Sequence, residues 1–410
     1  MTLQEAKESV ILAGKRLVES GLIARTWGNV SCRTDCGHFV ITPSGRDYLT
    51  LTPEEIVEVA ISDLTYQGMV KPSSEKGIHA EVYKLHSHIN FVIHTHQDQA
   101  SVVSVLEMPS IKVSKDYTSL KAEVVCADYG LPGTKKLRNG VIQALALSKG
   151  NAVIMKHHGA LCYGASYEEA FQVAQELEDA CKDYIRKQFV KVSHNQHSDP
   201  VSDGCIALSR LIGTNISPAG ALILSPCESE RISGGFRLQY GTESYDIRSD
   251  LSSLQNSLKL QAEAAGQNET KLVNEAKLHW LIYHNRKNIN NIIHAKSPGI
   301  QAVSCAGTKV LPLLDDFAQI AGTCVRVAKG KREAIKALKS SSAVFLPRNG
   351  ALCCGSERGD AIAVSMVAEK NSNALIGAAM FGRIKYINHL ECLLMRLVYL
   401  KKYSKQASKK

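Results

Sequence analysis

The sequence predicts a mixed α/β or α+β domain that is built twice along the chain. Two observations support this. Helix-like and strand-like periodicities alternate through the first 190 residues, and two blocks of sequence recur in the same order. Residues 75–104 match residues 275–304 without a gap, and residues 151–166 match residues 342–357. Because two blocks in a fixed order rarely recur by chance, we interpret the chain as a tandem duplication.

The repeat divides the chain into two domains. We expect the first copy at residues 1–193 and a linker at residues 194–204, where HNQHSDPVSDG is polar and contains a proline and a glycine. The second copy is expected at residues 205–410 and ends in a lysine-rich tail. Residues 205–270 cannot be aligned with the start of the first copy from the sequence alone.

Each expected element has a local basis. Leu3, Ala6 and Val10 begin a helical spacing. A hairpin follows, in which Asp35-Cys36-Gly37 form the turn. Pro53 suits the first turn of another helix, and Ser73 or Ser74 is a suitable cap for the next. The expected order is a helix at 3–20, a hairpin at 30–42, helices starting at 51–59 and at 73–85, strands at 90–95 and 152–155, and a helix at 167–187.

Composition excludes several classes of protein. Of the 410 residues, 44% are hydrophobic and 21% charged, which is ordinary for a globular chain. The net charge of +10 is spread without aromatic interleaving, so we expect no nucleic-acid partner. No run of eighteen apolar residues occurs, so no membrane span is expected. The acidic N-terminus does not resemble a secretory signal. The twelve cysteines form no CxxC pair. These features favour a cytoplasmic protein with reduced thiols.

Histidines of the first copy form a candidate metal site. His94 and His96 lie two residues apart on an expected strand, so their side chains point to the same face. Neutral imidazole is a common metal ligand, although an isolated HxH pattern is also typical of two hydrogen-bonded histidines. His157 or His158, before Gly159, could supply a third ligand. Spacing does not decide which of the two points inward.

A carboxylate completes the candidate site. Glu75 stands at the start of a helix, where it either takes part in chemistry or complements the helix dipole. In the second copy Glu275 and His294 remain, but Lys296 replaces His96 and Asn349 replaces His158. A cationic lysine cannot replace a neutral imidazole ligand. We therefore predict one functional site and one degenerate site.

Potential anion donors occur in the same copy. Residues 25–31 offer backbone N–H groups, an amide and hydroxyls, and residues 42–45 form a turn with free donors. Ser73 and Ser74 lie at a helix N-terminus, which favours a phosphate. Taken singly, each is an ordinary turn or cap. The second copy has Val273-Asn274 at the serine positions, so it has lost these donors together with the histidines.

These motifs together identify a family resemblance. The first copy resembles the class II aldolase/adducin family, which includes fuculose-phosphate and rhamnulose-phosphate aldolases and ribulose-phosphate 4-epimerase. The second copy resembles it in its latter two thirds only. The matching motifs are TWGNVS at 26–31, ITPSG at 41–45, PSSE with its histidine at 72–79, HTH at 94–96, LPGT at 131–134 and HGA at 158–160.

The resemblance implies a site and a fold. It implies one divalent metal per chain, usually Zn²⁺ with Mn²⁺ or Co²⁺ also compatible, held by His94, His96 and His158. Glu75 is then the acid/base. The implied fold is a class II aldolase-like three-layer α/β/α domain with a mostly antiparallel sheet. The implied phosphate cradle consists of Gly28, Asn29, Ser44, Gly45, Ser73 and Ser74.

The resemblance also implies an activity. We expect a metal-dependent aldolase that acts on a phosphorylated ketose and yields dihydroxyacetone phosphate and an aldehyde. An epimerase, dehydratase or decarboxylase using the same metal enediolate is an alternative, as is a non-catalytic adducin-like scaffold. The family's additional acid has no clear match, and Asp116 and Tyr117 are the nearest candidates. We expect a sugar-phosphate ligand, no membrane partner, and a homo-oligomer in which two chains form a pseudo-tetramer.

Overall fold

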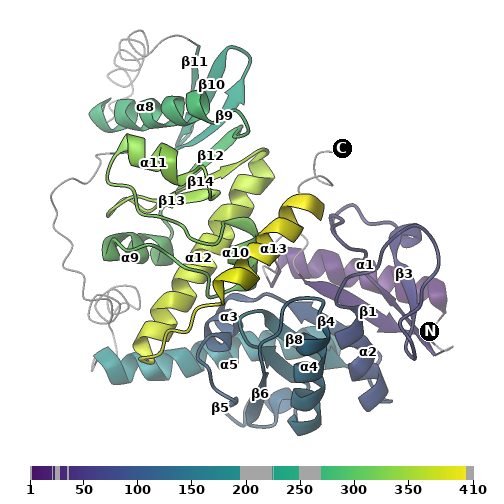
Figure 1. Cartoon of the computed structure of the whole chain (residues 1–410). Coiled ribbons are helices and arrows are strands. Elements are labelled where there is room, and N and C mark those ends of the chain that lie inside the picture. The colour runs from purple at the N-terminus through teal and green to yellow at the C-terminus, as the bar shows by residue number, and fades with distance from the viewer. Residues whose placement is uncertain are drawn as a thin grey trace. The chain divides into compact units, whose positions relative to one another are not determined.

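The computed structural model describes most of both copies (Figure 1). The described residues are 2–20, 22–23, 28–34, 37–193, 224, 226–248 and 269–402. They form two compact units that divide near residue 196. The expected linker at 194–204, the turn residues Asp35 and Cys36, motif residues Thr26 and Trp27, and most of the lysine-rich tail lie outside the described residues. The predicted domain boundaries therefore stay predictions.

The first unit contains an eight-stranded sheet. Its strand order is β3-β2-β1-β4-β8-β7-β6-β5, and every neighbouring pair is antiparallel except β6 and β7. The strands are β1 (Asn29–Arg33), β2 (His38–Ile41), β3 (Val57–Ala60), β4 (Phe91–Thr95), β5 (Ser110–Lys112), β6 (Glu123–Ala127), β7 (Ala152–Met155) and β8 (Gly159–Gly164).

Helices cover both faces of this sheet. On one face, α2 and α4 bury aliphatic side chains against Val92, Val153 and Leu161. Helices α1 and α5 pack on the other face, against β1 and β8 respectively. The sheet therefore lies between two helical layers, as expected. The helices are α1 (Leu3–Glu19), α2 (Lys76–Leu85), α3 (Asp98–Ser104), α4 (Lys135–Leu147) and α5 (Tyr167–Ser193).

The second unit repeats this plan. Its sheet has the order β11-β10-β9-β12-β14-β13, with α8 on one face and α12 on the other. The strands are β9 (Glu228–Ile232), β10 (Gly235–Tyr240), β11 (Glu243–Ile247), β12 (Asn291–Ala295), β13 (Ala343–Phe345) and β14 (Ala351–Gly355). The helices are α8 (Glu269–Asn285), α9 (Pro298–Ala306), α10 (Asp315–Ile320), α11 (Lys331–Ala337), α12 (Arg358–Met380) and α13 (His389–Lys402).

Buried polar contacts align the two copies where the sequence could not. Arg33 on β1 donates to the carbonyls of Tyr83 and Ile89. Arg231 on β9 donates to those of Tyr283 and Ile289. The strand β9 therefore corresponds to β1 with an offset of 198 residues, obtained as 231 minus 33. The duplication predicted from the sequence thus extends to the strands at the start of the second copy.

Two local predictions are wrong. Residues 51–59 do not start a helix, because Pro53–Glu55 is a single 3-10 turn and β3 follows it. Val57 and Val59 alternate with half-buried neighbours, a period that suits a strand paired with β2. The N-cap of α2 is Glu75 rather than a serine, and the Ser73 hydroxyl accepts a hydrogen bond from the Glu75 N–H at 3.2 Å. The strands at β5, β6 and β8 and the helices α3 and α4 were not predicted.

The other predicted elements are present. The helix at 3–20, the antiparallel strands of the hairpin, the strands at 90–95 and 152–155, and the helix from Tyr167 are all found. In the part of the chain that the structure describes, no helix is both long enough and apolar enough to cross a membrane.

Candidate metal centre of the first copy

Three buried histidines meet at the end of β4. His94 lies in β4, His96 follows the strand, and His158 lies in the turn between β7 and β8. The ring centroids lie 4.7 Å apart for His94 and His96, 4.8 Å for His94 and His158, and 4.9 Å for His96 and His158. One ligand nitrogen from each ring lies within 4.8 Å of the others. Three imidazoles at this spacing are a donor set that suits a divalent transition metal.

The turn before β8 selects which histidine faces this cluster. His157 adopts a left-handed backbone conformation, with φ of 61°, and its Nε2 lies 2.9 Å from Glu107 Oε1. It therefore points away from the site while His158 points into it. Gly159 follows, and a Cβ there would lie 2.3 Å from the carbonyl oxygen of Thr95. Glycine is thus what lets the turn approach β4 closely.

Hydrogen bonding fixes the tautomer of His94. Its Nδ1 lies 2.8 Å from the carbonyl oxygen of Ala160. Because a carbonyl only accepts, Nδ1 carries the proton, and Nε2 of the neutral ring faces the cluster with a lone pair. Burial lowers the pKa of His94 well below its ordinary value, which favours the neutral ring. The donor set and its backbone support therefore fit a bound cation.

Glu75 closes the cluster from the start of α2. Its Oε1 lies 2.7 Å from His158 Nε2 and its Oε2 lies 3.3 Å from His94 Nε2. Asn29 donates from Nδ2 to Oε2 at 2.9 Å. Burial by itself would raise the pKa of Glu75, but the adjacent imidazoles outweigh it and hold that pKa well below its ordinary value. The group is therefore a carboxylate directed at the histidines.

A second layer of polar groups lies behind Asn29. His79 Nε2 is 2.5 Å from Asn29 Oδ1, and His79 Nδ1 is 2.7 Å from the Ser31 hydroxyl. The Tyr83 hydroxyl is 2.7 Å from the same Ser31 oxygen. Sequence reasoning did not assign these residues to the site. Their identity in the two copies, as His79/His279 and Tyr83/Tyr283, was the signal that could have found them.

The predicted phosphate donors lie on neighbouring loops. Ser44 N–H donates to the Lys71 carbonyl at 3.0 Å, and Ser73 N–H donates to the Thr42 carbonyl at 3.1 Å. These bonds bring the Ser44-Gly45 turn beside the Ser73-Ser74 segment. Gly28 precedes β1 with φ of 117°, and a Cβ there would lie 2.5 Å from the His94 carbonyl oxygen. The Asn29 side chain contacts Glu75 and His79.

The corresponding site of the second copy is rearranged. Lys296 Nζ donates to Asn349 Oδ1 at 3.1 Å. His294 Nε2 lies 2.5 Å from the Asn349 carbonyl oxygen and His294 Nδ1 lies 2.7 Å from Glu275 Oε1. Both ring nitrogens of His294 therefore face oxygen atoms, so neither presents a lone pair to a shared space. Among the residues that the structure describes, the only three-ligand cluster is the one in the first copy.

Comparison with known proteins gives matches in both copies. A family model described as Class II Aldolase and Adducin N-terminal domain matches residues 8–185 and 248–375. A 5-deoxy-D-ribulose 1-phosphate aldolase from Bacillus thuringiensis serovar kurstaki is 30% identical over 193 residues, which cover 46% of this chain and 89% of that protein. An L-fuculose phosphate aldolase from Escherichia coli O6:H1 is 33% identical over 166 residues, covering 40% of this chain and 75% of that protein.

A solved structure also matches. An L-fuculose 1-phosphate aldolase is 30% identical, with a TM-score of 0.43 over 46% of this chain and 89% of that chain. The alignments with individual relatives thus include most of each relative but less than half of this chain.

Proposed function

Because the chain belongs to the class II aldolase and adducin family, we propose that its first copy is a metal-dependent aldolase. The reaction joins or cleaves a carbon–carbon bond of a phosphorylated ketose, with dihydroxyacetone phosphate and an aldehyde as the smaller partners. The observation that carries the proposal is the buried cluster of His94, His96 and His158 with the Glu75 carboxylate against it. The names of the two aldolase relatives support a ketose 1-phosphate as substrate.

We assign His94, His96 and His158 as the ligands of one divalent ion per chain, most readily Zn²⁺. Mn²⁺ and Co²⁺ are compatible with the same donors. When bound, such an ion supplies Lewis acidity for the negative charge that develops on the substrate oxygens. The second copy, with Lys296 and Asn349 at two of the three positions, is proposed to hold no ion.

Glu75 is proposed as the base and acid of the reaction. In the direction of synthesis its carboxylate takes a proton from the carbon next to the carbonyl of dihydroxyacetone phosphate. The electron pair left on that carbon forms the bond to the aldehyde carbon. The aldehyde oxygen gains a proton from solvent, and Glu75 releases the proton it took from carbon to solvent, so the step balances. In cleavage the same carboxylate returns the proton to carbon. Glu75 suits this role because the adjacent imidazoles hold its pKa well below the ordinary value, it is only 8% exposed, and Asn29 donates a hydrogen bond to it.

The phosphate is proposed to bind at the neighbouring loops, through Gly28, Ser44, Gly45, Ser73 and Ser74. Ser73 and Ser74 precede α2, so the positive end of the helix dipole supports the negative charge there. The second copy has Val273 and Asn274 at these two positions. Loss of the hydroxyls together with the histidines supports one shared role for both sets.

The test is cleavage of 5-deoxyribulose 1-phosphate and fuculose 1-phosphate by the zinc-loaded chain. We expect release of dihydroxyacetone phosphate, and a loss of about 10²-fold or more in kcat for Glu75→Gln, since a positioned acid–base group contributes about 10²–10⁴-fold. Epimerised, dehydrated or decarboxylated product without carbon–carbon cleavage would replace aldolase by a sibling reaction. No turnover of any ketose phosphate, with metal bound, would contradict an enzymatic role.

We also propose that the chain forms a homo-oligomer through α13. Leu390, Leu393, Leu397 and Leu400 follow the three-four-three spacing of a coiled-coil seam and are 70%, 39%, 52% and 44% exposed. A second copy of this chain presents the same stripe, so a two-fold pairing buries identical apolar faces. In this assembly two chains contribute four domains, which is the expected pseudo-tetramer.

Mass measurement in solution tests this interface. We expect a dimer for the natural chain and a monomer for the double variant Leu393→Glu, Leu397→Glu. Leu147→Glu is the matched control, because Leu147 is 71% exposed on α4 and lies outside the stripe. A dimer that survives the double variant, or a natural chain that is monomeric, would contradict the proposal.

A further inference from the structure

Asn29 connects two buried groups that differ in function. Its Nδ2 donates to Glu75 Oε2 at 2.9 Å, and its Oδ1 lies 2.5 Å from His79 Nε2. Asn29 is 5% exposed and His79 is fully buried. The family resemblance implied a phosphate contact for this residue. Its side-chain partners in the structure are the proposed base, Glu75, and His79.

The donor and the acceptor of each hydrogen bond in this buried network follow from the orientation of the Asn29 amide. Asn29 presents its Nδ2 to Glu75 Oε2 and its Oδ1 to His79 Nε2, and an amide oxygen only accepts. Nε2 of His79 therefore carries the proton, and Nδ1 accepts from the Ser31 hydroxyl. Ser31 in turn accepts from the Tyr83 hydroxyl at 2.7 Å. Burial lowers the pKa of His79 to about 3, so the ring stays neutral and keeps this single tautomer.

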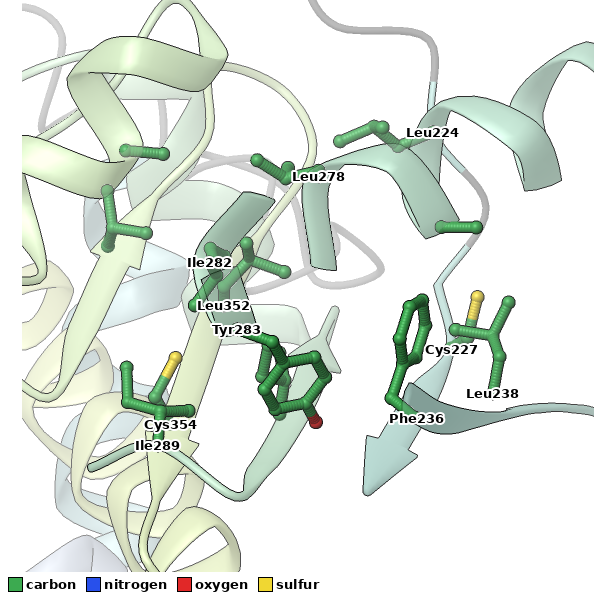
Figure 2. Packing of buried hydrophobic residues seen from close by; sticks show 14 of the residues in the cluster. Leu224, Cys227, Phe236, Leu238, Leu278, Ile282, Tyr283, Ile289, Leu352 and Cys354 are labelled. Carbon is green, nitrogen blue, oxygen red and sulfur yellow. The ribbon is translucent and has the colours of Figure 1, made fainter. Parts of the chain in front are cut away.

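The second copy has the same contacts among serine, histidine and tyrosine but lacks the asparagine. Ser229 lies 2.8 Å from both His279 Nδ1 and the Tyr283 hydroxyl, as Ser31 does for His79 and Tyr83. By the same 198-residue offset, the position of Asn29 is occupied by Cys227. Figure 2 shows Cys227 beside Phe236 and Leu238 in the apolar cluster of that unit.

The carboxylate of the second copy has a different position. Glu275 Oε1 lies 2.9 Å from His279 Nε2 and 2.7 Å from His294 Nδ1, so the carboxylate contacts both histidines directly. In the first copy the corresponding groups, Glu75 and His79, are separated by the Asn29 amide. The comparison within one chain indicates that the amide occupies the space between the carboxylate and His79 in the first copy.

We propose that Asn29, oriented by His79, is a positioning residue that holds the Glu75 carboxylate toward the histidine cluster. The inference rests on the proposed function, in which Glu75 moves the proton. It assigns the loss of Asn29 as a further cause of inactivity in the second copy, besides the loss of two histidines. It also predicts that Asn29 affects the chemical step more than substrate binding.

Two substitutions separate positioning from phosphate binding. Asn29→Cys introduces the residue of the second copy, and Asn29→Asp keeps the shape but removes the donor to Glu75. We expect kcat to fall at least about tenfold in both, with KM within about twofold of its natural value. The comparison variant Ser73→Ala should instead raise KM more than it lowers kcat. If the Asn29 variants raise KM and retain kcat, Asn29 is a phosphate ligand and the proposal is overturned.

A substrate-free measurement keeps the proposal independent of the activity. Nitrogen-15 NMR of the imidazoles reports the tautomer of His79 in the full chain. We expect the Nε2–H form in the natural protein, and a shifted Nε2–H signal in Asn29→Cys and Asn29→Asp. An Nδ1–H tautomer of His79, or an Nε2–H signal that neither variant shifts, would overturn the proposed hydrogen bond between His79 and Asn29. If the natural chain cleaves no ketose phosphate, the proposed function fails while this result still decides the geometry.

Discussion

Replacing Arg33 by methionine should selectively destabilise the first copy. Arg33 donates to three carbonyl groups near the C-terminal end of α2. They belong to Tyr83 in the last turn and to His86 and Ile89 after the helix, at 2.6, 3.0 and 2.9 Å. Methionine fills similar space but has no donor. Since α2 carries Glu75 at its start, this contact also holds the helix that positions the base.

The expected loss can be estimated from those bonds. A hydrogen bond contributes about 1 kcal/mol net, so losing three costs about 3 kcal/mol of unfolding free energy. For a domain of this size about 1 kcal/mol corresponds to roughly 2–4 °C, so the unfolding transition of the first copy should fall by about 6–12 °C. The natural second copy supplies the control, because Arg231 donates to the equivalent carbonyls.

The assay is differential scanning calorimetry with hydrogen exchange of peptides from α2 and α8 to assign each transition. Arg33→Met should lower the transition that exposes α2 and leave the other in place. Arg231→Met should do the reverse. A shift below about 2 °C would refute the estimated contribution of these hydrogen bonds. The same transition moved by both variants would refute the claim that each arginine stabilises its own copy.

Three further predictions concern the site and its supports. Zinc at about 100 times its Kd should stabilise the first copy by about 2.7 kcal/mol, and a chelator should reverse this in the natural chain but leave His96→Ala unchanged; an equal response of both in calorimetry would contradict the ligand assignment. Gly159→Ala should lower stability by about 1–3 kcal/mol in denaturant titration, because the new Cβ would lie 2.3 Å from the Thr95 carbonyl oxygen; an unchanged midpoint would argue against that close approach. Glu178→Gln should lower the free energy of unfolding by about 1 kcal/mol in the same titration, because the Glu178 carboxylate accepts hydrogen bonds from the N–H groups of Gln99 and Ala100 in the first turn of α3. An unchanged free energy of unfolding would show that this cap does not stabilise the fold.

Much of the fold could be predicted because its signals are local. The amphipathic spacing of α1 and the apolar strands β4 and β7 are visible in single segments. The segment at 51–59 failed because Pro53 is typical of a helix start, whereas the pairing of Val57 and Val59 with β2 is decided by distant residues. Local propensity was overridden by tertiary contact there.

The candidate site shows the same division. The period of the strand places His94 and His96 on one side, but the choice between His157 and His158 depended on a left-handed backbone that the sequence does not reveal. The role of Asn29 depended on contacts with residues 46 and 50 positions away. No spacing rule links such positions, although the repeat marked His79 and Tyr83 as shared by both copies.

Metal content per chain tests the central claim most directly. The purified natural chain and His96→Ala would be dialysed against zinc, desalted and analysed by elemental mass spectrometry. One functional and one degenerate site predict one ion per natural chain and none in the variant, because the only described cluster of three histidine ligands is His94, His96 and His158. Two ions per chain, or none in the natural chain, would contradict it.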